Sequence, residues 1–182
     1  MANKASFTPD EWTTVMESVA VTGMAVTAAD PSGLWGMLKE ALAGGAALTA
    51  AKADPKTNEL VKAVIADFET ADSRAAVQEA LKQRFADAKP GDVVPRALEI
   101  LQQASAVLDA KAPADAPAFK AWLNGVAAKV AEASTEGGFL GFGGVKVSDA
   151  EKATLADIAK ALGTTASAWG VRTQVRSRSW SH

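Results

Sequence analysis

The chain has 182 residues, of which 48% are hydrophobic and 22% are charged, with a formal net charge of −2. This balance predicts a globular domain with a core of its own and excludes a chain that is disordered as a whole. Cysteine and tyrosine are absent, which excludes disulfides, thiolate metal sites and cysteine nucleophiles, and the abundance of alanine with only 6% aromatic residues predicts an all-α fold.

The first predicted helix begins with a complete set of start signals. Thr8 is in the N-cap position, Glu11 closes a capping box with it, and Phe7 and Trp12 are spaced as a hydrophobic staple. The helix is expected to run to about Ala29. Its apolar side chains cover a broad surface, so we predict that it lies at the centre of the fold: Trp12, Val15, Met16, Val19, Met24 and Val26.

Further helix starts follow along the chain, two of them marked by an aspartate with proline directly after it. Proline suits the first helical turn because the backbone N–H groups of that turn have no partner within the helix, so the N–H that proline lacks is not missed there. Helices are predicted to begin at Asp30–Pro31 and Asp54–Pro55, to begin or continue at Ser73, and to cover about 93–111, 117–136 and 148–162. The sequence therefore predicts a single-domain bundle of six or seven helices over residues 1–170.

A glycine-rich loop, Gly137 to Ser148 with the sequence GGFLGFGGVKVS, precedes the last predicted helix. Its glycines permit positive φ at several points, while Phe139, Leu140 and Phe142 require an apolar environment. The loop ends at Ser148, which forms a capping box with Glu151 at the start of the last helix.

Three interpretations of this loop remain open. The apolar side chains can fold back over the helices that contain Trp122 and Leu155 and plug the core, or they can form an exposed tip that grips a protein partner or a small ligand. The backbone N–H groups and Lys146 can also hold an anion, although the spacing fits neither a P-loop nor a dinucleotide-binding turn. We predict the plug, because burial of each Phe ring contributes about 2 kcal/mol. The candidate ligand-binding or partner-binding residues are Phe139, Leu140, Phe142 and Lys146.

No catalytic residues, resident metal or cofactor are predicted. Without cysteine or tyrosine, and with one histidine near the C-terminus, no nucleophile and base can be paired. Acidic residues such as Asp149 and Glu151 lie where helix starts favour negative charge. The alternative is a small-molecule or divalent-metal-binding module, or an enzyme that uses carboxylates, with Asp30, Asp149 and Glu151 at equivalent turns.

The C-terminal residues 179–182, SWSH, resemble the opening of a streptavidin-binding purification tag, and an Arg-Ser-Arg-Ser linker precedes them. We therefore expect residues 171–182 to be a vector linker and a truncated tag. On this interpretation the natural protein contains no histidine. The competing interpretation is a native basic arm that binds nucleic acid or anionic lipid.

Two segments resemble TerB-like helical proteins, a family linked to tellurite resistance and stress responses. The better match runs from Gly144 to Gly163. The residues that match the family's sequence pattern there are Gly144, Val147, Ser148, Glu151, Leu155, Ile158, Leu162 and Gly163. The other, Ala25 to Leu42, keeps Ala-Ala-Asp but has Pro31 where the family has glycine. The resemblance implies an all-helical fold and divalent-cation binding through acidic residues near these turns. Because Pro31 replaces the family's glycine directly after Asp30, the resemblance supports cation binding less strongly than it supports the fold.

The N-terminal residues lack the apolar region of a signal peptide, and no uncharged stretch has the length and hydropathy of a membrane span. Charges of both signs are scattered, which is typical of solvated helix faces and predicts no nucleic-acid or membrane partner. The sequence thus predicts a cytoplasmic, non-enzymatic interaction or regulatory module with an unknown protein partner or small ligand.

Overall fold

The computed structural model describes residues 1–29, 52, 57–136 and 148–164. Several predictions lie outside these residues. They are the helix start at Asp30–Pro31, most of the glycine-rich loop with its four candidate binding residues, and the linker and tag at 171–182.

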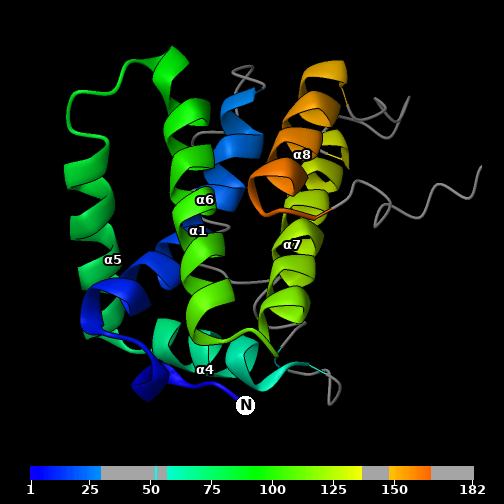
Figure 1. Cartoon of the computed structure of the whole chain (residues 1–182). Coiled ribbons are helices and arrows are strands. Elements are labelled where there is room, and N and C mark those ends of the chain that lie inside the picture. The colour runs from blue at the N-terminus through cyan, green and yellow to red at the C-terminus, as the bar shows by residue number, and fades with distance from the viewer. Residues whose placement is uncertain (30–51, 53–56, 137–147, 165–182) are drawn as a thin grey trace, which may run out of the picture.

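The described chain is all-α, as predicted, with six α-helices, two short 3₁₀ helices and no strand among the residues described. Figure 1 shows the helices packed side by side, with α4 crossing one end of the bundle. The elements in chain order are η1 (Lys4–Ser6), α1 (Pro9–Ala29), α4 (Glu59–Phe68), α5 (Ala71–Arg84), η2 (Pro90–Asp92), α6 (Val93–Lys111), α7 (Ala116–Glu136) and α8 (Asp149–Ala161).

Helix α1 begins as its sequence predicts. The Thr8 N–H donates to Glu11 Oε2 at 2.8 Å, and the Glu11 N–H donates to Thr8 Oγ1 at 3.3 Å. The rings of Phe7 and Trp12 pack with their centroids 5.5 Å apart. The capping box and the staple are therefore both confirmed, and they fix the direction in which the chain enters the central helix.

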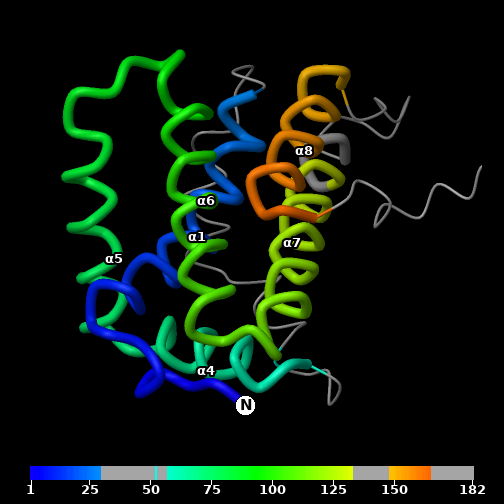
Figure 2. Tube along the Cα trace, viewed as in Figure 1, coloured from blue at the N-terminus to red at the C-terminus, as the bar shows by residue number. Residues whose placement is uncertain are grey.

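Helix α1 is also central, as predicted: it packs most extensively on α6 and contacts α4, α5, α7 and α8 as well (Figure 2). Because neighbours surround it, polar side chains on α1 are buried together with the apolar ones. The Ser18 and Thr22 hydroxyls donate to the carbonyls of Val15 and Ser18 in their own helix, at 2.6 and 2.7 Å. These bonds satisfy the hydroxyl groups without a partner from another helix.

The boundary of α4 corrects one prediction. The start predicted at Asp54–Pro55 is too early for this helix, because Thr57 and Asn58 are not helical and the Asn58 side chain accepts from the Leu60 N–H at 2.9 Å. Asn58 is therefore the N-cap. Helix α5 begins at Ala71 with Thr70 as its N-cap, two residues before the start expected near Ser73.

Helices α6, α7 and α8 match their predicted ranges within two residues. Ser148 and Glu151 form the predicted capping box at the start of α8, with distances of 2.8 and 3.1 Å. At the other end, Gly163 has φ of +66°, and the N–H of Thr164 donates to the Ala159 carbonyl at 2.9 Å. This is a Schellman motif, which needs a residue without Cβ strain at the left-handed position.

Candidate functional site: a buried glutamate and the polar ties of the bundle

None of the candidate binding residues predicted from the sequence lies within the described part of the chain. Phe139, Leu140, Phe142 and Lys146 are all outside it, as is Asp30. The prediction that the glycine-rich loop plugs the core therefore stays a prediction.

The other two acidic residues of the alternative metal site have separate roles. The Asp149 side chain is 98% exposed and pairs with Lys152 at 2.8 Å, whereas Glu151 is buried and its carboxylate caps α8. No group of three or more acidic or histidine side chains in residues 1–29, 52, 57–136 and 148–164 is placed to hold a metal ion.

The most unusual buried group is Glu17, near the middle of α1, whose side chain is 1% exposed. Its Oε1 accepts from Arg84 Nε, at the end of α5, at 3.0 Å. Arg84 Nη1 also donates to Gln103 Oε1 on α6 at 2.9 Å. The other carboxylate oxygen of Glu17, Oε2, is buried and has no hydrogen-bond partner among the described atoms.

This environment disfavours the charged form of Glu17. Burial raises the pKa of its carboxyl group above the ordinary value, and the charge and hydrogen bond of Arg84 only partly offset this effect. A buried carboxylate with one free oxygen and a single charged partner can take up a proton or accept a further hydrogen bond. Such perturbed groups are concentrated at functional sites, although ion pairs that serve structure perturb them too.

The sequence reasoning above did not identify Glu17, although a signal was present. Glu17 is the only charged residue between Trp12 and Ala29, in a stretch that is otherwise apolar or small. A single charge on a helix expected at the centre of a fold must be buried or must face a partner. The identity of that partner, Arg84, required the three-dimensional structure because 67 positions separate the two residues.

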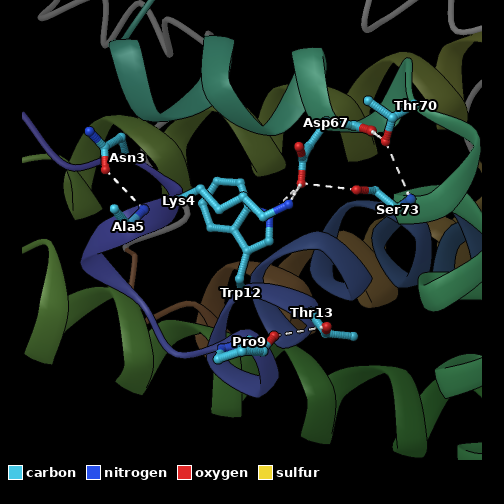
Figure 3. Close-up of polar contacts among 9 residues, drawn as sticks. All are labelled: Asn3, Lys4, Ala5, Pro9, Trp12, Thr13, Asp67, Thr70 and Ser73. Carbon is cyan, nitrogen blue, oxygen red and sulfur yellow. Dashed lines mark hydrogen bonds and ion pairs between the residues drawn. The ribbon is translucent and has the colours of Figure 1, made fainter.

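A second polar cluster is centred on Asp67, at the end of α4 (Figure 3). Its Oδ2 accepts from Trp12 Nε1 at 2.7 Å, from Lys4 Nζ at 2.8 Å and from Ser73 Oγ at 3.1 Å. Asp67 thereby ties together η1, α1 and α5. Burial opposes ionisation, but these hydrogen bonds outweigh it and hold the pKa of Asp67 below its ordinary value.

We expect replacement of Asp67 by asparagine to cost about 2 kcal/mol of stability at pH 7, the scale of hydrogen bonds to a charged group. Because the folded-state pKa lies below the unfolded one, this contribution is present above about pH 4 and is lost as the pH falls through the folded value. Urea denaturation of both proteins at pH 7 and at pH 3 tests this. If the two proteins differ in their free energy of unfolding by the same amount at both pH values, the stabilising role assigned to the ionised Asp67 carboxylate is wrong.

Two further polar groups, both buried, connect distant parts of the chain in the same way. Asp115 accepts from the Ala2 N–H at 2.7 Å and from Asn58 Nδ2 at 2.8 Å, and these bonds lower its pKa. Lys120, on α7, donates to both carboxylate oxygens of Asp109 on α6 at 2.7 Å. These groups fix the packing of the bundle.

Comparison with known proteins returns no matching family model, no matching curated protein and no matching solved structure. The resemblance to TerB-like proteins therefore stays a prediction. Within the described residues, no helix combines the length and the apolar character that crossing a bilayer requires.

Proposed function

We propose that the protein is a cytoplasmic interaction or regulatory module, which acts by binding a protein partner and not by covalent chemistry. The observation that carries this proposal is the use made of three ionisable groups in the described bundle, the buried Asp115 and Lys120 and the half-buried Asp67. Asp67, Asp115 and Lys120 each bond to side chains or backbone of other elements. Groups held in this way stabilise the packing and are poorly placed to exchange protons with a substrate.

We further propose Phe139, Leu140, Phe142 and Lys146 as the binding residues. Two features of their flanks support this choice. Helix α7, which ends at Glu136, buries Phe119 and Leu123 in the core, and α8 begins at the Ser148–Glu151 capping box and buries Ile158. The apolar segment therefore joins two packed helices, which hold its two flanks in the bundle.

The test is a double variant, Phe139→Ala with Phe142→Ala. If these residues bind a partner, the variant loses specific cross-links to it in cells that express the protein, while its urea denaturation midpoint stays within error of the wild type. If the loop plugs the core, as the sequence predicts, the midpoint falls instead. Cross-linking followed by mass spectrometry measures the amount of partner that is specifically cross-linked to each variant.

A matched control is Lys129→Ala with Lys152→Ala, which removes exposed side chains from the flanking helices α7 and α8. This control is expected to keep both stability and cross-links. If the phenylalanine variant instead loses more than about 3 kcal/mol of stability, the two rings belong to the core and the proposed binding surface is wrong. The proposed binding surface is also wrong if the phenylalanine variant keeps both its full stability and its cross-links to the partner.

A further inference from the structure

Helix α5 is held to the bundle by little apolar contact. Of its fourteen residues only Val77, at 4% exposed, is a buried hydrophobic residue, whereas the ten-residue α4 buries Leu60, Val61, Val64 and Ile65. Leu81 and the following Phe85 are partly buried against the core. In Figure 1, α5 lies at the edge of the bundle, and the helices that it contacts most are α1 and α4.

Polar contacts hold α5 at both of its ends. At the start, Ser73 Oγ donates to Asp67, and Arg74 Nη1 donates to the carbonyls of Phe68 and Glu69 at 3.1 Å (Figure 3 shows the Ser73 contact). At the end, Arg84 bridges Glu17 of α1 and Gln103 of α6. Helix α5 is therefore held by polar contacts at its two ends, and few buried apolar side chains lie between them.

The ion pair between Arg84 and Glu17 has an energetic cost, because the Glu17 carboxylate loses its hydration. Movement of α5 away from the bundle would remove this cost. With α5 in place, Glu17 is almost fully buried and one of its oxygens has no partner among the described atoms. If α5 moved away, water would reach this carboxylate. Ion pairs with a desolvated partner are only marginally favourable, since the loss of hydration nearly cancels the attraction.

From these contacts we propose that α5 is a detachable helix, which opens as a unit while α1, α6, α7 and α8 stay packed, and that the Arg84–Glu17 pair sets how often it opens. Local opening of this kind is expected where buried apolar contact is least. The opening exposes the Glu17 face of the central helix. This inference is independent of the proposed binding through residues 139–146.

The pair also makes the opening depend on pH. Of the described charged groups on α1 and on the helices packed against it, Arg84 is the one whose charge acts on the pKa of Glu17, and the facing Gln103 is neutral. The raised pKa means that the closed form binds a proton at Glu17 more tightly than an open form with a hydrated carboxylate. Proton uptake therefore favours the closed form, and raising the pH through that pKa favours opening.

Hydrogen exchange of the intact protein, measured by mass spectrometry and corrected for intrinsic rates, tests the proposal. In the wild type we expect amides in residues 75–84 to be at least tenfold less protected than those of α7. Arg84→Met is expected to lower the protection of α5 by a further tenfold or more and to leave α7 unchanged. The matched control is Lys82→Met in the same helical turn, where the exposed lysine pairs only loosely with Glu79 at 3.8 Å; its effect should stay below twofold.

A second variant keeps the test decisive if Arg84→Met fails to fold. Glu17→Gln keeps an oxygen that accepts from Arg84 but has no titrating group, so α5 should lose the pH dependence that its protection shows in the wild type above the ordinary glutamate pKa of 4.5. The proposal is overturned if α5 and α7 exchange with equal protection in the wild type, if Arg84→Met weakens both helices equally, or if the pH dependence survives in Glu17→Gln.

Discussion

Replacement of Trp12 by alanine is expected to lower the free energy of unfolding by about 4 kcal/mol, within the range for deletion of a buried large aromatic side chain. Trp12 is 4% exposed, its ring packs at a tilt against Phe7 at the start of the central helix, and its Nε1–H donates to Asp67. The substitution therefore removes core volume, the hydrophobic staple and one of the three donors to the Asp67 carboxylate.

Trp12→Phe is the control that separates these effects. It keeps most of the apolar volume but removes the Nε1–H donor, so we expect a loss of about 1.5 kcal/mol, the lower end for hydrogen bonds to a charged group. Urea denaturation of all three proteins at pH 7 gives the comparison. A loss below about 2 kcal/mol for Trp12→Ala would show that this end of α1 is not part of the cooperative core.

Replacement of Phe119 by alanine is expected to have a similar effect, a loss of about 4 kcal/mol. Phe119 is completely buried in α7, where it packs edge to face against Trp122 with ring centroids 5.3 Å apart. Phe119 belongs to the buried core cluster of the bundle, so a cavity at this position removes contacts from that core.

The matched control is Trp122→Ala, on the same helix and in contact with Phe119. Although tryptophan is the larger residue, Trp122 is only partly buried, so we expect a smaller loss of about 2 kcal/mol. Thermal or urea denaturation measures both. If the Trp122 variant were the less stable of the two, the burial assigned to this face of α7 would be wrong.

The helix starts could be predicted from the sequence because capping is local. The Thr8–Glu11 and Ser148–Glu151 boxes each involve residues three positions apart, and both form as predicted. The prediction failed at α4, where the Asp-Pro signal at 54–55 suggested an earlier start than the one Asn58 makes. Both signals are chemically valid, and local rules alone do not select between two possible caps, Asp54 and Asn58, that lie four positions apart.

The sequence alone thus determined the all-α class, the ends of most helices and the central place of α1, because these depend on backbone capping and on the spacing of apolar residues. Only the tertiary structure decided which polar groups meet. Glu17 pairs with Arg84 across 67 positions, and Asp67 accepts from Trp12 across 55. Such pairs depend on how the helices pack against one another, and no periodicity within a single helix specifies which distant side chain faces a buried charge.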